Sequence, residues 1–279
     1  MALNQDAIGK NIGSVVKEYT WKDVVLYALG VGAGFSEIEY CYEKNLKVLP
    51  SFAVSTIIDF FFETGINSNS NLAGLLHGEQ ELTFHEPFPV EGTLTTNGKI
   101  TNYYDKGKDK GAIIKAESET YHSNGKKLFT GVITIFSRLD GGFGGENFHG
   151  KPVDFPTRDP DHVVMATPSK DQPLLYRLSG DVFQLHVDQE FAEMCSFKRP
   201  IMHGLCTHGY ACRALIQSLT PGTPEKVKRL DCRFSGVLYP GTPIKTLIWN
   251  TGKGKAVWRT INGETNDLVI DNGVFEYDC

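Results

Sequence analysis

The sequence predicts an α+β protein built from two similar halves, each with one buried helix followed by a run of antiparallel strands. Apolar residues recur at helical spacing in residues 51–63 and again in residues 203–219. Strand-like segments separated by turn residues follow both of these helices. A glycine-rich stretch at residues 141–150 divides the two series. Duplication of a helix-and-sheet unit explains these observations, and a single mixed α+β domain with coincidental symmetry is the alternative.

In the first half, the helix is expected over residues 51–63, with Ser51 as its N-terminal cap. Asn124-Gly125 predicts a tight hairpin turn before the last strand, because these residues tolerate positive φ angles. A sheet with one apolar face hides that face from water when it wraps around such a helix. The expected strands of this half are residues 81–92, 94–105, 111–123 and 127–138.

In the second half, the helix is expected over residues 203–219. Asn262-Gly263 again marks a hairpin turn before the last strand-like segment. The apolar stripe of the helix is formed by Leu205, Tyr210, Ala211, Leu215 and Leu219. The expected strands are residues 228–241, 242–252, 254–263 and 266–278.

A linker is expected between the halves. Residues 141–150 contain five glycines, and three prolines follow within the next ten residues. Glycine gives the backbone freedom, and proline cannot donate to a strand ladder. We therefore expect an N-terminal half over residues 1–140, a linker over residues 141–165 and a C-terminal half over residues 166–279.

Composition and charge exclude several classes of protein. The 279 residues carry 28 Lys and Arg against 33 Asp and Glu, so no basic field for nucleic acid is expected. The longest apolar stretch, residues 52–66, contains two acidic residues and is too short to span a membrane. Six cysteines without a CxxC pair indicate a reduced, intracellular protein. No secretory signal is expected at the N-terminus, and Tyr277-Asp278-Cys279 is not a peroxisomal targeting tripeptide.

The residues with the clearest chemical potential lie between positions 175 and 209. Asp181 precedes His186 by five residues, and a carboxylate paired with an imidazole can hold a water molecule and move its protons. Gly204 follows at the head of an apolar helix, where unpaired N–H groups face developing negative charge. Taken singly, an Asp and a His at this spacing are more often ordinary turn residues. The whole segment favours a catalytic loop.

Two other patterns suggest cofactors only superficially. His203, Cys206 and His208 have metal-like residue types, but on a helix His208 points away from the other two, so no metal is expected. The glycines of residues 30–34 follow a helix-like segment and lack the last glycine of a dinucleotide-binding fingerprint. No cofactor of any kind is therefore expected.

The segment around Asp181 resembles the signature of the MaoC-like, hot-dog-fold (R)-specific enoyl-CoA hydratases, known as hydratase 2. The chain is most similar to the hydratase 2 part of peroxisomal multifunctional enzymes of type 2, over nearly its whole length. In the first half, the similarity is carried by residues 27–33, 48–50 and 76–80. The resemblance implies a double hot-dog fold, in which the second half keeps the catalytic loop and the first half accommodates the acyl chain.

The same resemblance implies several substrate contacts. His77 and Gly78 match positions that contact the acyl-CoA, as does Lys106, although Lys110 lies in a second Asp-Lys-Gly copy and is an equal candidate. A solvated surface charge is the alternative role for either lysine. The loop residues Val182, Phe183, Gln184 and Leu185 and the strand residue Phe234 complete the expected contacts.

Phe183 departs from the family pattern. The signature usually reads Gly-Asp-x-Asn-Pro-Leu-His, whereas residues 180–186 read Gly-Asp-Val-Phe-Gln-Leu-His. A phenyl ring can neither donate nor accept the hydrogen bond that an amide makes there. Gln184 carries an amide one position later, where its side chain is expected to point elsewhere. The departure bears on activity more than on fold.

The expected function is reversible hydration of a trans-2-enoyl-CoA to the (R)-3-hydroxyacyl-CoA in fatty-acid β-oxidation. Asp181 and His186 would bind the water and Gly204 would stabilise the thioester oxygen, but the sequence leaves open which member of the pair is the base. A hot-dog acyl-CoA thioesterase and, because of Phe183, a non-catalytic acyl-CoA-binding module are the alternatives. The resemblance further implies a homodimer, a peroxisomal location and origin from a longer multifunctional chain.

Overall fold

The computed structural model describes residues 3–150 and 152–279 of the chain. These residues form two compact units, and each unit combines segments that are distant in sequence. The first contains the N-terminal residues through Lys17 together with Ile57–Glu86 and Thr93–Pro152. The second contains Glu18–Thr56, Pro87–Gly92 and Val153–Cys279. A segment near the N-terminus thus belongs with the C-terminal half of the sequence.

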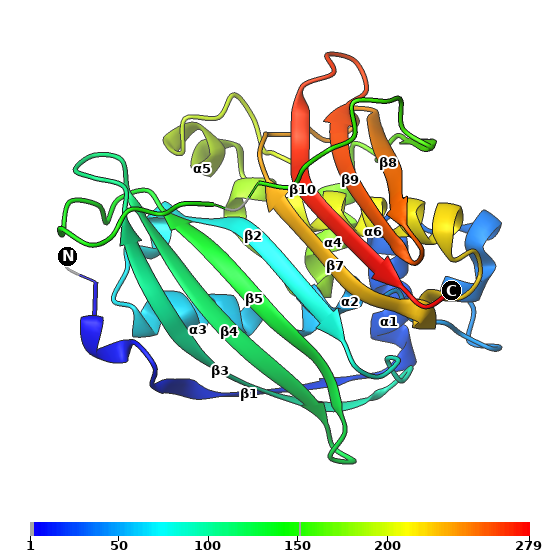
Figure 1. Cartoon of the computed structure of the whole chain (residues 1–279), viewed down its shortest axis with the longest axis horizontal. Helices are drawn as coiled ribbons and strands as arrows, with labels where there is room; N and C mark the ends of the chain where they lie inside the picture. The colour runs from blue at the N-terminus through cyan, green and yellow to red at the C-terminus, as the bar shows by residue number, and fades with distance from the viewer. Residues whose placement is uncertain (1–2, 151) are drawn as a thin grey trace. The chain divides into compact units, whose positions relative to one another are not determined.

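The first unit is an antiparallel sheet with a helix against one face. Along the sheet the strands follow the order β1-β3-β4-β5-β2 (Figure 1). The helix is α3 (Ile58–Asn67), and its Phe60 ring lies so close to Gly98 of β3 that a side chain at position 98 would collide with it. The strands are β1 (Asn11–Tyr19), β2 (Leu75–Phe84), β3 (Gly92–Asp105), β4 (Ala112–His122) and β5 (Lys127–Ser137).

The second unit has the same plan with additional helices. Its strand order is β7-β10-β9-β8-β6, and all neighbouring pairs are antiparallel. The long helix α6 (Gly204–Leu219) contacts β6, β7 and β8 and is buried along most of its length. The strands are β6 (His162–Ala166), β7 (Val227–Phe234), β8 (Ile244–Gly252), β9 (Lys255–Asn262) and β10 (Leu268–Tyr277). The other helices of this unit are α1 (Trp21–Gly30), α2 (Phe52–Thr56), α4 (Gln172–Tyr176) and α5 (Gln189–Met194).

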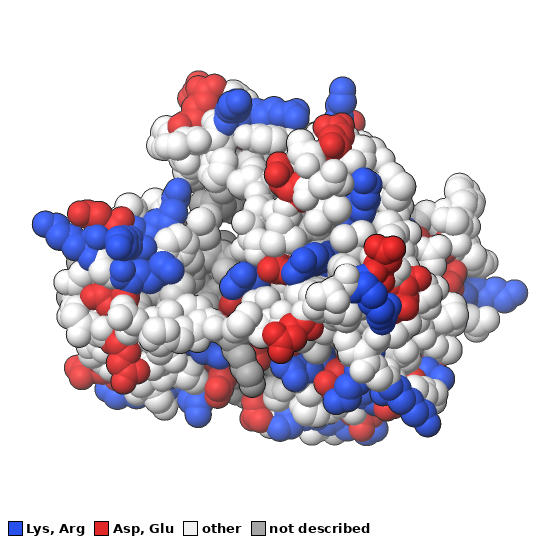
Figure 2. Space-filling model, turned by 45° about the horizontal axis from the view of Figure 1, so that its top comes forward, with Lys and Arg blue, Asp and Glu red and all other residues white. Residues whose placement is uncertain are grey.

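Short 3-10 turns connect these elements. They span Gln5–Ala7, Phe35–Tyr40, Leu72–Gly74, Arg177–Ser179, Gln184–His186 and Pro224–Lys226. No helix among the described residues is long and apolar enough to cross a membrane. On the face shown in Figure 2, Lys and Arg side chains are interspersed with Asp and Glu side chains.

The expected helix at residues 51–63 is two helices. The chain breaks at Ile57, where α2 ends and α3 begins, and this is also where it passes from the second unit to the first. Apolar residues continue through the break, so periodicity gives no sign of it. Helix α6, by contrast, coincides with the expected residues 203–219 to within one position.

The strand expectations differ from the structure at β2, at β7, which ends at Phe234 and not at residue 241, and at two strands that were not expected. Strand β2 begins at Leu75, not at residue 81, and its pairing with β5 shifts register between His77 and Glu79. Such a bulge bends the strand, and at Gly78 an added Cβ would lie 2.9 Å from the Thr134 carbonyl oxygen. Strands β1 and β6 have no counterpart in the sequence analysis, since their segments are short or mix polar and apolar residues.

The glycine-rich segment expected to be a linker is held against the first unit. The Asp105 carboxylate accepts hydrogen bonds from the N–H groups of Gly107, Gly142 and Gly144, at 2.8, 2.7 and 2.6 Å. These donors lower the pKa of Asp105. A side chain at Gly141 would collide with the Gly107 carbonyl oxygen, so glycine is required for this close approach.

Candidate active site

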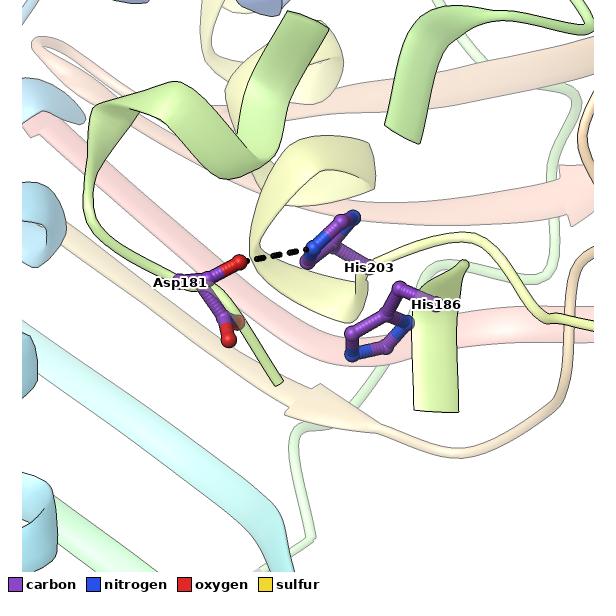
Figure 3. A group of neighbouring side chains, drawn as sticks. All are labelled: Asp181, His186 and His203. Atoms are coloured by element: carbon purple, nitrogen blue, oxygen red, sulfur yellow. Dashed lines mark hydrogen bonds between the residues drawn. The ribbon is translucent and has the colours of Figure 1, made fainter. Parts of the chain in front are cut away.

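Asp181, His186 and His203 come together in the second unit. Asp181 lies on the loop after the Arg177–Ser179 turn, where Gly180 has a φ of 123°. His186 ends the Gln184–His186 turn, and His203 precedes the first residue of α6. The nearest polar side-chain atoms of the three residues all lie within 4.8 Å of one another (Figure 3). Their approach therefore requires the loop and the head of α6 to fold against each other.

The protonation of the His186 ring follows from its hydrogen bond. Nδ1 lies 2.9 Å from the carbonyl oxygen of Ile201. A carbonyl oxygen only accepts, so Nδ1 carries the hydrogen and Nε2 of the neutral ring has a free lone pair. The Ile201 carbonyl thus leaves Nε2 as the basic nitrogen.

Asp181 and His186 form a coupled pair in a poorly solvated environment. Burial raises the pKa of the Asp181 carboxyl, opposed by the charge of His186 and by the Phe183 N–H. Burial lowers the pKa of His186, opposed by Asp181 and by the Ile201 hydrogen bond. Both directions favour the uncharged forms. Burial therefore shifts the pair toward a protonated carboxyl beside a neutral imidazole, the form in which Nε2 can accept a proton.

Gly204 begins α6 with its backbone exposed. Among the described residues, no acceptor is found for its N–H, as is usual for the first turn of a helix. The positive end of the helix dipole is at this position. A Cβ on Gly204 would lie 2.9 Å from Cδ1 of Phe234, so glycine is also required for packing. The Gly204 N–H is therefore available to donate a hydrogen bond to a ligand oxygen.

Phe183 is half-buried and packs beside His186. Its ring meets Phe191 of α5 edge-on at 5.3 Å between centroids and lies 6.4 Å from the His186 ring. The neighbouring loop residues alternate in burial: Val182 and Gln184 are exposed, whereas Leu185 is buried. Phe234, at the end of β7, lies against Gly204 as noted above. The structure thus brings Phe183 and Phe234 next to the candidate catalytic residues.

The remaining expected contacts lie in the first unit. His77 and Gly78 form the bulge of β2, and the His77 ring stacks on Phe61 at 5.4 Å between centroids. Burial lowers the pKa of His77 to about 4. Lys106 is exposed with its Nζ 5.7 Å from the centre of the Phe136 ring, and Lys110 is exposed in the same β3–β4 connection.

The side chains of His203, Cys206 and His208, the residues with metal-like types, do not converge on one point. Cys206 donates its S–H to the Gly30 carbonyl oxygen, and the His208 ring lies 6.5 Å from that of Trp258. The only group of three suitable ligands among the described residues is Asp181, His186 and His203. The two imidazoles of that group are stacked at 3.7 Å with 25° between their planes, so their in-plane lone pairs do not point to one common position.

The glycines of residues 30–34 have a structural explanation. The carbonyl groups at the end of α1 accept hydrogen bonds from Gln172, from Cys206 and from Nη1 of Arg213. Gly32 has a φ of 82°, and a side chain there would collide with the Tyr210 ring. These glycines allow the loop to approach α6 closely.

His203 is the residue that sequence reasoning missed, since it was considered only as a metal ligand. Its position directly before Gly204, at the head of the buried helix, was the available signal. The side chain is fully buried, and Nε2 donates a hydrogen bond to the backbone oxygen of Asp181 at 3.1 Å (Figure 3).

Comparison with known proteins gives two family matches that together cover most of the chain. Residues 18–139 match the family described as "MFE-2 hydratase 2 N-terminal domain", and residues 149–273 match the "MaoC like domain". Three relatives illustrate the range of similar proteins. "3-hydroxyacyl-thioester dehydratase Y" of Mycobacterium tuberculosis is 35% identical over 99% of each chain. "Probable enoyl-CoA hydratase 2" of Dictyostelium discoideum is 36% identical over 96% of this chain and 94% of its own. "Peroxisomal multifunctional enzyme type 2" of Drosophila melanogaster is 35% identical, over 91% of this chain and 44% of its own.

Solved structures agree with this assignment. A MaoC-like dehydratase from Phytophthora capsici has a TM-score of 0.86 and 30% identity, over 99% of both chains. A Mycobacterium tuberculosis protein described as having a double hot-dog fold has a TM-score of 0.61 and 12% identity, covering 97% of this chain and 96% of its own, and supports the fold alone. The expected double hot-dog fold is confirmed, and the chain belongs to the MaoC-like hydratase 2 family of hydro-lyases.

Proposed function

We propose that this protein reversibly hydrates trans-2-enoyl-CoA thioesters to (R)-3-hydroxyacyl-CoA thioesters, with no cofactor. The observation that carries the proposal is the pairing of Asp181 with a His186 ring whose Nε2 is free, beside the exposed N–H at the head of α6. Relatives named for enoyl-CoA hydration and for 3-hydroxyacyl-thioester dehydration support the two directions of one reaction.

The geometry supports the following proton transfers. The Nε2 lone pair of His186 takes a proton from a bound water, whose oxygen adds to C3 of the enoyl group. The Asp181 carboxyl, whose pKa burial raises, gives its proton to C2. The products are the neutral hydroxyacyl thioester, an Asp181 carboxylate and a protonated His186. Transfer of the His186 proton to Asp181, directly or through solvent, restores the starting pair.

The thioester oxygen gains negative charge while C3 is attacked. The Gly204 N–H, at the positive end of α6, is the donor for that oxygen. Glycine at this position leaves room for the thioester to approach, since the adjacent space is already occupied by Phe234.

The two halves of the chain would divide the work. The catalytic residues all lie in the second unit, and the first unit supplies His77 and Gly78 for the acyl chain and Lys106 or Lys110 for the CoA phosphates. We further propose a peroxisomal location, supported by the relative named as a peroxisomal multifunctional enzyme. The family resemblance adds a homodimer and a role in fatty-acid β-oxidation to this proposal.

The test is to incubate the protein with a medium-chain trans-2-enoyl-CoA and follow enoyl absorbance, free thiol and product chirality together. Hydration lowers the absorbance without thiol release and gives the (R)-alcohol. Thiol release instead would identify a thioesterase, and binding without turnover would identify a non-catalytic acyl-CoA-binding module.

Variants test the residue assignment. Asp181→Ala and His186→Ala are each expected to lower kcat by at least about a hundredfold, the usual loss for a general acid or base. Both should melt close to the parent protein. His162→Ala, on edge strand β6, is the matched control and should keep full activity. Retained activity with a large loss of stability in the first two variants would show that the pair is structural.

A further inference from the structure

His203 connects both members of the Asp181–His186 pair. Its Nε2–H donates to the backbone oxygen of Asp181 at 3.1 Å, and its ring stacks on that of His186 with 3.7 Å between centroids. The side chain is completely buried, and its other face meets the Tyr176 ring at 4.9 Å. One side chain thus contacts the backbone of the carboxylate residue and the ring of the imidazole residue.

The segment that carries His203 also holds the loop through its backbone. The Ile201 carbonyl accepts the Nδ1–H of His186, and the Ile201 N–H donates to the Leu185 carbonyl at 3.3 Å. Met202 is tied in turn to Leu238 by a hydrogen bond of 2.8 Å from its N–H. Residues 201–203 are therefore fixed to the body of the unit. They hold the catalytic loop through the backbone of Ile201 and the side chain of His203.

We infer that His203 is a positioning residue, which holds the Asp181 carboxyl and the His186 ring at the separation that proton transfer requires. The inference rests on the proposed hydratase function and names a residue that acts through the pair without touching the substrate. Two physical contributions can be separated: the hydrogen bond to the Asp181 backbone and the stack on His186.

The charge state of His203 fits this role. Because a carbonyl oxygen accepts from Nε2, the hydrogen of the neutral ring is on that nitrogen, and Nδ1 has no hydrogen-bond partner among the described residues. Burial and the neighbouring charges of His186 and Arg177 lower the pKa of His203 to about 2, while the hydrogen bond to Asp181 opposes them. His203 therefore stays uncharged and adds no competing proton site while the pair exchanges its proton.

Enclosure by His203 also affects the pH range in which the pair holds one proton. Desolvation disfavours the charged forms of both residues. It therefore opposes protonation of His186 at low pH and ionisation of Asp181 at high pH, which sets the two limbs of the pH profile. Removing the enclosing ring admits water and weakens both effects. The acidic and basic limbs of the pH profile should then move toward each other.

Two variants separate the contributions. His203→Gln keeps a donor for the Asp181 carbonyl and removes the stack, whereas His203→Phe keeps a ring and removes the donor. We expect kcat to fall about tenfold for His203→Gln, the effect of one altered buried contact. For His203→Phe we expect a fall of roughly a hundredfold, because release of the loop misplaces the reacting group. KM should change less than kcat in both variants. The limbs of the kcat profile should converge in His203→Gln, which removes the enclosing ring, and should move less in His203→Phe, which keeps one.

The matched control is His208→Gln, since His208 is also a fully buried histidine of α6 and has no role in the mechanism. Melting curves and kcat profiles are measured for all proteins. A merely structural His203 would lower the folded fraction and leave the pH limbs in place. Unchanged limbs in His203→Gln, or an equal loss of kcat in His208→Gln, would overturn the inference.

Nitrogen-15 NMR of the imidazoles gives a readout that needs no turnover. In the parent protein, His186 is expected as the Nδ1–H tautomer, and its titration should shift in the His203 variants but not in His208→Gln. The NMR titration therefore tests the positioning role of His203 separately from the hydratase function. An inactive parent whose His186 titration still depends on His203 would refute the hydratase function and support positioning, and an active parent without that dependence would do the reverse.

Discussion

Replacing Phe183 with Asn should increase activity at a modest cost in stability. The Phe183 ring lies 6.4 Å from the ring of His186, which would hold the catalytic water. A buried water needs two to four polar partners for a fixed orientation, and a phenyl ring supplies none. An oriented polar partner near a reacting centre contributes about 2.7–4 kcal/mol to catalysis, so the gain in kcat/KM is expected to be up to roughly a hundred- to a thousandfold.

The cost follows from the contact with Phe191. Phe183→Asn loses an edge-on aromatic pair with 5.3 Å between centroids, which is worth about 0.5–1.5 kcal/mol beyond the area it buries. Because Phe183 is only partly buried, the total loss should remain near the average for a single substitution, about 1 kcal/mol. The melting temperature should therefore fall by only a few degrees.

The assay is kcat/KM on one medium-chain trans-2-enoyl-CoA for the parent and three variants, with melting curves for each. Phe183→Leu removes the ring without adding an amide, and so separates space from hydrogen bonding. Gln184→Ala removes the neighbouring exposed amide and tests whether it already holds the water. A Phe183→Asn protein that is folded but no faster than the parent would refute the reasoning. A slower one would identify Phe183 as an adaptation of this chain.

Two further predictions concern Gly204 and His77. Gly204→Ala should lower kcat about a hundredfold or more, because the added methyl group blocks access to the N–H. It should also destabilise the protein by about 1–3 kcal/mol through the clash with Phe234. Adding Phe234→Leu should recover stability but not kcat, and recovery of both would show that Gly204 serves packing only. The pKa of His77 is lowered from 6.5 to about 4 in the folded protein. As the pH falls from 6.5 toward 4, His77 is protonated in the unfolded chain but not in the folded one, so protonation stabilises the unfolded state and the free energy of unfolding decreases. Denaturant titrations of the parent should show that the free energy of unfolding falls by about 2 kcal/mol between pH 7 and pH 5 because of this group. His77→Gln should remove that part of the loss. An identical pH dependence in both proteins would contradict the assignment.

The local pattern of the sequence was sufficient for the repeated helix-and-strand plan. Helix α6 and the hairpin at Asn124-Gly125 lie where apolar spacing and turn chemistry place them. These features depend on residues close in sequence, which is why they can be predicted. The break at Ile57 and strand β1 cannot be predicted in this way, because they depend on which unit each segment packs against.

The candidate site, like the fold, could be predicted from the sequence only in part. The residue types and spacing of Asp181, His186 and Gly204 identified them as candidates, with the family resemblance giving their roles. Sequence spacing could not indicate that His203 stacks on His186, or that the Ile201 carbonyl fixes the tautomer of that ring.

Those two contacts join segments fifteen or more residues apart. They form because the buried Leu185 and Met202 anchor the catalytic loop and the head of α6 in the same core. The sequence by itself therefore determined which groups are available for proton transfer. Only the tertiary structure decided which nitrogen is free and what holds it in place, because the directions of a carbonyl group and an aromatic face depend on packing between distant segments.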